Sequence, residues 1–375
     1  MSEALARHVA AAGHEVLVVT AAYGDEPTEE VRDGVRIVRL PSMAITSRIA
    51  FNYDIPFTAS PRNARRLFRL LDDFEPDVVH QHGQFFDLTW MSSIWARRRR
   101  VPTVLTVHTR FQSPFRLHAA AMCVADYLVV RPFVRLGRPY VVPVDVFVRD
   151  YVKTRFGIPE SRIVDIPVGI EPERFRAADR SEVRQRLGIG DRPMMLSMGH
   201  VIPLRDRLAL VEAMPTLLAR FPELVVVVAG RIYDERFVLR ARELGVDHAL
   251  IMAGEISKND VPLYAAAADV EGHDLQGLGF GMASLEMLAA GTPVVSVVRA
   301  DNYPTAPFVD GEHLILASSS EPGVLAGAIG RLLDDPELRE RVGAGGRRLV
   351  EEQFSMELVT QRYLELYQRA RDESR

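Results

Sequence analysis

The sequence predicts an α/β fold with parallel sheets, divided into two domains. Short apolar runs, such as Glu15 to Thr20 and Met194 to Met198, alternate along the chain with stretches of helical spacing. Apolar strands separated by amphipathic helices are typical of parallel sheets whose two faces are covered by helices. The 375 residues exceed the usual size of one core, and the second half of the chain repeats the alternation of the first.

The composition is that of a globular protein. Hydrophobic residues make up 47% of the chain and charged residues 26%, which is enough apolar material for two sizeable cores. The formal net charge of -4 predicts no nucleic-acid partner. The one cysteine, Cys123, cannot form an internal disulfide, so we expect a buried core residue and a reducing cytoplasm.

The sequence offers one segment that a membrane could bind. The N-terminus lacks the features of a signal peptide, and we expect no stretch of about eighteen apolar residues, so a cytoplasmic location is predicted. From Phe85 to Arg100, aromatic and aliphatic residues precede four arginines, and such a segment could lie on an anionic membrane surface. The alternative, which we favour, is a core-facing helix with arginines at its C-terminal end.

In the first half of the chain, a helix from Ser60 to Phe74 has the clearest boundary signal. Ser60 supplies an N-cap and Pro61 a first-turn proline. From Tyr127 to Val142 the chain is apolar but broken by arginine, proline and glycine, so we expect strand and turn there. The other expected elements are helices at Met1 to Ala12, Phe85 to Arg100 and Val144 to Phe156, and strands at Glu15 to Thr20, Gly34 to Leu40, Asp77 to His80, Thr103 to His108 and Arg162 to Ile166.

The second half begins after a turn rich in breaking residues, Pro167 to Glu171, where we expect a domain boundary. Helices dominate from Glu321 onward. The elements expected between these points are helices at Ser181 to Leu187, Arg205 to Arg220 and Asp234 to Leu244, and strands at Met194 to Met198, Leu224 to Ala229 and Ala249 to Met252.

Polar or glycine-rich sequences follow four of the expected strands. The carboxyl ends of parallel strands carry the ligand-binding loops of such sheets, so these are candidate site segments. Any one of them could instead be structural. They are His80 to Gly83, His108 to Arg110, Gly199 and His200 leading to Arg205, and Gly230 with Arg231.

The stretch from Leu278 to Val295 has a pattern that favours an anion-binding site. Gly279 and Gly281 let the backbone approach a ligand closely, and the helix that follows offers unpaired N–H groups and the positive end of its dipole. Glu286 lies on the same helix, and a carboxylate is suited to pairing with sugar hydroxyls. The pattern predicts a nucleotide or sugar-phosphate site, and the alternative is an ordinary junction between a loop and a helix.

Motifs along nearly the whole chain, taken in order, resemble the family-4 glycosyltransferases, retaining enzymes with the architecture called GT-B. These motifs are LARHVAAAGHEVLVVT, DVVHQHG, TVLTVHT, RIVDIPVGIEPERF, VPLYAAAADV and GFGMASLEMLAAGTPVV. The resemblance implies two Rossmann-like parallel-sheet domains that face each other across a cleft. It implies an acceptor-side domain at 1–168, a nucleotide-sugar domain at 169–354, and a C-terminal helix at 355–375 that crosses back to the first domain through Leu358, Tyr363, Leu366 and Tyr367.

The resemblance also implies the reaction. A glycosyl group would pass from a nucleotide-diphosphate sugar, which is a co-substrate rather than a cofactor, to a hydroxyl of a glycan, lipid or small-molecule acceptor. No metal is expected, because cationic side chains and helix ends would stabilise the leaving diphosphate. The sequence agrees, since it shows no Asp-x-Asp element at a strand end. The Phe51 to Phe57 loop is an acceptor-side candidate and equally a surface loop.

The resemblance implies a role for each residue that matches one of the family's motifs. His108 matches the family's histidine beside the transferred sugar, and Glu286 matches the second glutamate of its E-x7-E motif, which would hold the ribose. Arg205 falls at the family's lysine position, where its planar fork suits a diphosphate. The remaining donor-side residues are His200 and the amides of Gly279, Phe280 and Gly281 at the diphosphate, and Gly254, Glu255 and Ile256 near the base.

Three positions depart from the family pattern. Leu278 replaces the first glutamate of the E-x7-E motif, and leucine accepts no hydrogen bond, so Glu271 or Asp274 could take over that role. We predict Asp274 as a second catalytic residue beside His108. His200 stands where the family usually has arginine, for which Arg205 or Arg207 could compensate.

The third departure is the family's first strand and glycine loop, which are missing before the first helix. Because that strand is central in a doubly wound sheet, its absence predicts a gap between neighbouring strands. We predict that the coding DNA upstream of Met1 continues in frame with an apolar strand and a glycine loop. Two other functions stay open: a catalytically silent relative that binds nucleotide sugars or a partner, and a nucleotide-sugar epimerase.

Overall fold

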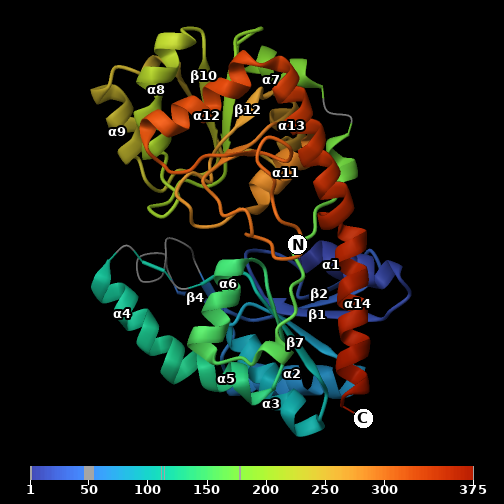
Figure 1. Ribbon diagram of the computed structural model, residues 1–375. Helices are drawn as coiled ribbons and strands as arrows, with labels where there is room; N and C mark the ends of the chain where they lie inside the picture. Colours follow the sequence, from blue (N-terminus) through green and yellow to red (C-terminus); the bar gives the residue numbers. More distant parts are fainter. Residues whose placement is uncertain (1, 46–54, 111, 114, 177–178, 375) are drawn as a thin grey trace. The chain divides into compact units, whose positions relative to one another are not determined.

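The computed structural model describes residues 2–45, 55–110, 112–113, 115–176 and 179–374 of the chain. The chain forms two compact units, Met1–Gly169 with Met356–Arg375, and Ile170–Ser355. Each unit contains parallel strands covered by helices (Figure 1), so the predicted α/β class is confirmed. Residues 51–54 of the acceptor-side candidate loop lie outside the described residues.

The N-terminal unit contains two three-stranded sheets. One sheet has the order β1-β3-β2, in which β1 and β3 are parallel and β2 is antiparallel, and the other is the parallel sheet β6-β7-β8. A short antiparallel pair, β4 with β5, completes the unit. The strands are β1 (Val16–Ala21), β2 (Glu29–Arg32), β3 (Val35–Leu40), β4 (Met43–Ile45), β5 (Ile55–Phe57), β6 (Val79–His82), β7 (Thr103–Val107) and β8 (Tyr140–Pro143).

Helices cover these sheets in the order that the sequence predicts. Ser60 caps α2 by accepting a hydrogen bond from the Asn63 amide, with Pro61 in the first turn, which confirms the predicted boundary. All five residues of β7 are buried, as expected for an apolar strand in a parallel sheet. The helices are α1 (Ser2–Ala11), α2 (Pro61–Phe74), α3 (Asp87–Arg99), α4 (Arg116–Ala125), α5 (Arg131–Leu136), α6 (Val146–Tyr151) and α14 (Met356–Asp372), with π-helical turns η1 (Asp126–Val130) and η2 (Val152–Phe156) and the 3₁₀ turn η3 (Glu160–Arg162).

Helix α14, although last in the sequence, packs into the core of the N-terminal unit. Tyr363 and Val359 are fully buried there against α1, β7 and β8, with Leu5, Val104 and Tyr140 among their cluster. The Tyr363 hydroxyl lies 2.9 Å from Thr106 Oγ1 of β7. The helix is therefore a structural part of this unit rather than a peripheral tail.

The two sheets of the N-terminal unit are not joined. Among the described strands, β1 pairs only with β3, and β6 pairs only with β7. A cavity of about 1110 Å³ lies between these two edges, lined by β1 on one side and by Val78 to His82 on the other. All six residues of β1 are half-buried, whereas those of β7 are buried. The edges of β1 and β6 are therefore unpaired among the described strands, at the place where the sequence predicts a gap.

Several sequence predictions are wrong. Cys123 is half-buried rather than a core residue, and the strand expected at Arg162 to Ile166 is reduced to a single bridge at Ile163. Residues 116–136 form one continuous helical segment, made of α4, η1 and α5, where we expected strand and turn from Tyr127 onward. Pro132 does not break this segment, because it lies in the first turn of α5 after a π-helical turn, where a missing N–H is tolerated. The segment is also long and apolar enough by composition to cross a membrane, with a mean hydropathy of 1.4, contrary to the expectation from sequence.

The C-terminal unit is built on a parallel sheet of order β11-β10-β9-β12, beside which β13 pairs with β14. A bridge between Glu271 and Val294 links β12 to β13. The strands are β9 (Met194–Met198), β10 (Val225–Ala229), β11 (Leu250–Gly254), β12 (Val270–Glu271), β13 (Val295–Ser296) and β14 (Ile315–Leu316). The helices are α7 (Arg180–Arg186), α8 (Leu208–Arg220), α9 (Arg236–Glu243), α10 (Val261–Ala267), α11 (Met282–Ala290), α12 (Pro322–Asp334) and α13 (Pro336–Leu349), with short turns η4 (Pro172–Phe175), η5 (Asp247–Ala249) and η6 (Val350–Phe354).

Glycines on α13 let this helix approach the loops behind α11 closely. A Cβ atom on Gly345 would lie 2.0 Å from the carbonyl oxygen of Glu312, and one on Gly343 would lie 2.2 Å from that of Gly291, where α11 ends. Backbone atoms cannot yield as a flexible side chain does. The position of α11 therefore depends on the absence of side chains at these points.

We predict that Gly345→Ala destabilises the C-terminal unit by about 2 kcal/mol or more, because the added methyl group overlaps a backbone oxygen. Gly327→Ala on α12 is the matched control: a Cβ atom added there would have no atom within 4 Å, so better helix propensity should stabilise it by about 0.5 to 1 kcal/mol. Urea unfolding followed by circular dichroism measures both changes. Equal stability of the two variants would contradict the close approach.

The cavity between β1 and β6 gives the predicted upstream strand a structural test. A chain extended by the upstream codons should unfold at a temperature higher by about 5 °C or more, because a strand paired with both edges would cover their half-buried side chains. Differential scanning calorimetry of both chains measures the difference. An in-frame stop codon directly upstream, or an unchanged unfolding temperature, would count against the prediction.

Candidate active site

The loops at the carboxyl ends of β9 and β10 lie against each other in the C-terminal unit. A Cβ atom on Gly230 would lie 2.4 Å from the carbonyl oxygen of Gly199, and its φ of +139° is one that other residues rarely adopt. The Gly199 amide donates to Ala229 O at 2.8 Å. Two of the four candidate strand ends are therefore in direct contact, and glycine is required for it.

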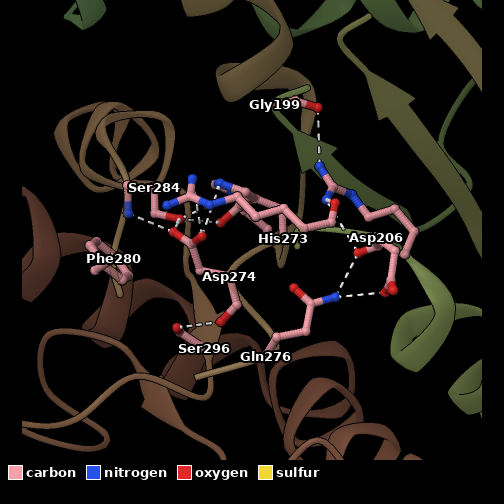
Figure 2. Close-up of polar contacts among 12 residues, drawn as sticks. Gly199, Asp206, His273, Asp274, Gln276, Phe280, Ser284 and Ser296 are labelled. Atoms are coloured by element: carbon pink, nitrogen blue, oxygen red, sulfur yellow. Dashed lines mark hydrogen bonds and ion pairs between the residues drawn. The ribbon is translucent and has the colours of Figure 1, made fainter. Parts of the chain in front are cut away.

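The carboxylate of Asp274 lies at the N-terminus of α11. Its Oδ2 accepts hydrogen bonds from the Gly281 amide at 2.6 Å and from the Ser284 hydroxyl at 3.1 Å, while Oδ1 lies 3.5 Å from Nη1 of Arg205. Figure 2 shows Asp274 between His273 and the first turn of α11, which carries Ser284. A carboxylate thus occupies a position suited to an anion at a helix N-terminus.

Asp274 is only 5% exposed, and its protonation reflects opposing effects. Burial by itself raises the pKa of a carboxyl group. The charges of His273 and Arg205, with the hydrogen bonds from Gly281 and Ser284, outweigh burial and lower the pKa of Asp274 below its ordinary value. Asp274 therefore stays ionised at neutral pH.

Two arginines at this site differ in exposure. Arg205 is 37% exposed at its side chain, so one side of its guanidinium pairs with Asp274 and the rest faces solvent. Arg207 is 1% exposed and donates to the carbonyl oxygens of Gly199 and Arg205 at 3.1 and 2.7 Å. Burial lowers the pKa of Arg207 to about 10, so it remains charged while it fixes the loop. Arg207 therefore stabilises the loop through hydrogen bonds to its backbone, and Arg205 is the arginine that a ligand can reach.

A buried polar network continues behind Asp274. His273 Nδ1 lies 2.6 Å from Glu271 Oε1, and the two side chains are 2% and 0% exposed. The Ser284 hydroxyl lies 3.3 Å from His273 Nδ1 and 3.5 Å from Glu271 Oε2. Glu271, which we considered as a replacement for the missing glutamate, is thus enclosed by protein side chains. Gln276 donates to Asp206 O and Oδ1, both at 2.8 Å, which ties the two loops together (Figure 2).

Glu286 differs from these carboxylates. It is half-buried on α11, and the structure shows no hydrogen-bond donor to it from the described residues. Burial raises the pKa of Glu286, and the charges of Arg174 and Lys258 only partly offset this effect. A partly dehydrated carboxylate without a donor is well suited to accept hydrogen bonds from ligand hydroxyls.

The turn before α11 is fixed by aromatic contacts. Phe280 is 4% exposed and packs on Phe308 with ring centroids 4.7 Å apart, and the Tyr303 hydroxyl donates to the Phe280 carbonyl at 2.8 Å. Gly279 has a φ of +123°, and half-buried Leu278 precedes it. The glycine turn is therefore held rigidly, although Leu278 contributes no polar group to it.

The remaining donor-side candidates lie on other strand ends. His200 is exposed, and its Nδ1 accepts a hydrogen bond from the Arg231 amide at 3.1 Å. Glu255 follows Gly254 at the end of β11 and pairs with Arg231 at 2.8 Å, both side chains being more than half exposed. Ile256 follows in the same loop. The structure thus links His200 to Glu255 through Arg231, a residue that sequence reasoning noted only as part of a strand end.

In the N-terminal unit, three histidines gather at the carboxyl ends of β6 and β7. His82 Nδ1 lies 3.0 Å from His108 Nε2, and the His80 and His82 rings lie 4.2 Å apart. His80 also contacts the hydroxyls of Thr106 at 2.8 Å and Tyr367 at 2.6 Å. The predicted catalytic residue His108 thus belongs to a hydrogen-bonded cluster rather than standing alone.

These histidines are neutral at physiological pH. Burial lowers the pKa of His82 to about 3 and that of His108 to about 4, and the charge of His108 further disfavours a proton on His82. Burial likewise holds the pKa of His80 well below its ordinary value. In the described part of the chain, no group of three or more His, Cys, Asp or Glu side chains has the arrangement of a metal site.

Two family models together cover most of the chain. Residues 2–174 match the model described as Glycosyltransferase Family 4, and residues 179–349 match that described as Glycosyl transferases group 1. With the two parallel-sheet units, these matches place the chain among the glycosyltransferases of the GT-B class. The chain belongs to glycosyltransferase family 4, which confirms the resemblance predicted from sequence.

Two relatives show the range of activities near this chain. A GDP-mannose-dependent alpha-(1-6)-phosphatidylinositol monomannoside mannosyltransferase of Mycolicibacterium smegmatis is 30% identical over 54% of this chain and 56% of its own length. A D-inositol 3-phosphate glycosyltransferase of Acidothermus cellulolyticus is 31% identical over 72% of this chain and 62% of its own. The chain thus spans less than two thirds of the length of either relative.

Two solved structures share the fold. A glycosyltransferase from Rickettsia africae superposes with a TM-score of 0.75 at 16% identity, covering 98% of this chain and 93% of that one. The Anabaena protein Alr3699/HepE in complex with UDP and glucose superposes with a TM-score of 0.72 at 16% identity, covering 97% and 93%. At this identity the likeness shows the fold alone.

Sequence reasoning missed several residues of the site. Ser284, Asp206 and Gln276 hold Asp274 and the loop after β9, and they received no role from sequence. The one available signal was Ser284, a polar residue in an otherwise apolar first turn of α11. Buried Arg207 was considered only as a ligand-binding residue, because its backbone partners cannot be read from sequence.

The histidine cluster predicts a stability that falls with acid. In the unfolded chain each imidazole has a pKa of about 6.5, whereas the folded values for His82 and His108 are about 3 and about 4. Below pH 6.5 the unfolded state therefore binds more protons, and stability falls as the pH is lowered toward the folded pKa values. We expect a loss of about 2 kcal/mol per histidine between pH 6.5 and 5.

Urea unfolding followed by tryptophan fluorescence tests this, because both tryptophans, Trp90 and Trp95, lie on α3 of the N-terminal unit. His82→Gln should show a smaller loss of stability between the two pH values than the unaltered protein. His248→Gln, an exposed residue of the C-terminal unit, is the control and should behave like the unaltered protein. A pH dependence that His82→Gln leaves unchanged would contradict the assignment.

Proposed function

We propose that this glycosyltransferase moves a hexosyl group from a nucleotide-diphosphate sugar to a hydroxyl of a membrane lipid headgroup of the inositol type. One observation carries the donor half of the proposal: the N-terminus of α11 lies beside Arg205 through Asp274, and the same helix carries the unpartnered carboxylate of Glu286 five residues after Gly281. The acceptor half is supported by the relatives, one of which acts on a phosphatidylinositol mannoside and the other on an inositol phosphate.

In the proposed donor site, each half of the nucleotide diphosphate meets a different group. Glu286 accepts hydrogen bonds from the ribose hydroxyls, and the exposed side of Arg205 pairs with the diphosphate together with His200. Amides of the Gly279, Phe280 and Gly281 turn supplement them. The base lies along the loop of Gly254, Glu255 and Ile256. Negative charge that develops on the leaving diphosphate is thus stabilised by a guanidinium and a helix dipole.

The position of Asp274 limits how the diphosphate can bind at the start of α11. The Gly281 amide already donates to Asp274, so the diphosphate has to use the neighbouring N–H groups or displace that carboxylate. We propose that Asp274 acts mainly by positioning Arg205 and the first turn of α11, and that a direct contact with the donor sugar requires its carboxylate to turn. Its role as a second catalytic residue stays a prediction.

In the proposed reaction, the bond between the anomeric carbon and the diphosphate oxygen breaks, and the diphosphate keeps the electron pair. A bond forms from the same carbon to the acceptor oxygen, on the same face of the sugar, and the acceptor hydroxyl passes its proton to an oxygen of the leaving diphosphate. His108, which is neutral at pH 7, donates or accepts a hydrogen bond at the transferred sugar. This role for His108 stays a proposal.

Glu286→Gln should weaken binding of the nucleotide diphosphate by about tenfold to a hundredfold, because the amide replaces a charged acceptor. Glu340→Gln, an exposed residue on α13, is the matched control and should bind as the unaltered protein does. Calorimetric titration with guanosine, uridine and adenosine diphosphates measures the affinities and names the base. Since the pKa of Glu286 is raised, affinity should also fall at mildly acidic pH in the unaltered protein and not in Glu286→Gln.

Transfer is then measured with the sugar donor that contains the nucleotide found to bind. Phosphatidylinositol or diacylglycerol in mixed micelles is the acceptor. Transfer to phosphatidylinositol supports the proposal, and transfer only to diacylglycerol or to a soluble sugar contradicts the acceptor. Asp274→Ala separates its two roles: a lower affinity for the free nucleotide diphosphate supports positioning, whereas slower transfer at unchanged affinity supports contact with the sugar. Unchanged kinetics in Asp274→Ala, with loss of activity in Glu286→Ala, would exclude both.

A further inference from the structure

Segment 116–136 of the N-terminal unit presents an apolar face to solvent. Leu117 is 88% exposed, Val124 56% and Leu128 73%, and their spacing of seven and four residues places them along one side of the helix. Phe115, directly before the helix, is 69% exposed. A run of large exposed apolar residues of this length marks an interaction surface.

The opposite side of the same helix is anchored in the protein. Met122, Val130 and Val134 are buried, and the buried carboxylate of Asp126 accepts a hydrogen bond from Tyr151 at 2.8 Å. Phe133 stacks on Trp90 of α3 with ring centroids 5.1 Å apart. Because one side is packed on the unit, the helix can lie on a membrane but cannot leave the protein to span one without breaking these contacts.

The charge of this region is opposite to that of the whole chain. Leu88 to Val144 contains nine arginines and one acidic residue, buried Asp126, whereas the chain as a whole carries a formal charge of -4. Arg116 and Arg135 are exposed on the segment itself, and Arg131 lies over the ring of Tyr127 at 5.3 Å. Apolar side chains flanked by arginines, without exposed carboxylates, match an anionic lipid surface.

We propose that residues 115–136 form the surface by which this enzyme docks on an anionic phospholipid membrane. Leu117, Val124 and Leu128 enter the boundary between headgroups and acyl chains, and the arginines pair with lipid phosphates. This inference rests on the proposed lipid acceptor, which such docking would bring to the enzyme. It also moves the membrane contact away from the segment that sequence singled out, Phe85 to Arg100.

The structure explains why Phe85 to Arg100 is less suited to that role. Its two tryptophans turn toward the protein, since Trp95 is 4% exposed with its indole N–H donating to Asp72, and Trp90 stacks on Phe133. Arg97 to Arg100 are exposed at the end of α3, although Arg99 pairs with Asp72 at 2.9 Å. Phe86 at the start of the segment is 39% exposed, so the apolar surface left there is small compared with that of the neighbouring segment.

Flotation with lipid vesicles tests the proposal. The purified full chain should float with vesicles of equal parts phosphatidylglycerol and phosphatidylcholine, and should float poorly with phosphatidylcholine alone or at high salt. The double variant Leu117→Glu/Leu128→Glu should lose about tenfold or more of its binding. The control Val31→Glu/Leu239→Glu adds the same charge at positions that are 74% and 57% exposed elsewhere, and should float as the unaltered chain does.

Three outcomes would overturn the proposal: no flotation of the unaltered chain, equal loss in both double variants, or binding that resists an alkaline carbonate wash, as expected of a spanning helix. Circular dichroism checks that both variants fold. Titration with the nucleotide diphosphate separates this test from that of the proposed function, because Leu117→Glu/Leu128→Glu should bind it normally. Loss of flotation with normal nucleotide binding supports the docking surface, and absence of nucleotide binding in the unaltered chain would refute the donor site alone.

Discussion

The carboxylate of Asp274 is the constraint on which the donor side of this enzyme depends. Buried at 5% exposure, it must be surrounded by donors, and it finds them in the Gly281 amide, the Ser284 hydroxyl and Arg205. The carbonyl of the same residue accepts from Ser296 at 2.8 Å, which fixes the turn to β13. The helix start and the arginine therefore cannot move independently, and in the proposed function the diphosphate would enter a site that is already ordered.

The sequence predicted the fold well because its local signals agree with its tertiary structure. Strands β7, β9 and β10 are apolar runs and are fully buried, and Ser60 caps α2 as its position indicates. The glycine turn and the place of Glu286 on α11 were predictable for the same reason, since a helix start can be read locally, while the role of Glu286 stays a prediction. The partners of Asp274 and Arg207 were not predictable, because they are set by contacts between the loops after β9 and β12 that depend on the folded sheet.

Segment 116–136 shows how a local signal can mislead. Arginines, Pro132 and Gly137 suggested breaks, yet Pro132 lies in a first turn, and Gly137 comes directly after α5 ends at Leu136. The contacts that hold the helix, Asp126 with Tyr151 and Phe133 with Trp90, join residues distant in sequence. The local residue pattern predicted strand and turn wrongly, because one face of the helix is stabilised by tertiary packing that a local pattern does not show.

In the proposed reaction, the two units would supply different chemistry. At the ends of β6 and β7, burial keeps His80, His82 and His108 neutral, so these histidines can exchange hydrogen bonds or manage a proton but bring no positive charge of their own. At the start of α11, Arg205 and the helix dipole provide that charge. In the proposed site, stabilisation of the leaving diphosphate therefore falls to Arg205 and the start of α11. The replacement of a glutamate by Leu278 would then affect the proposed contacts to the sugar rather than those to the leaving diphosphate.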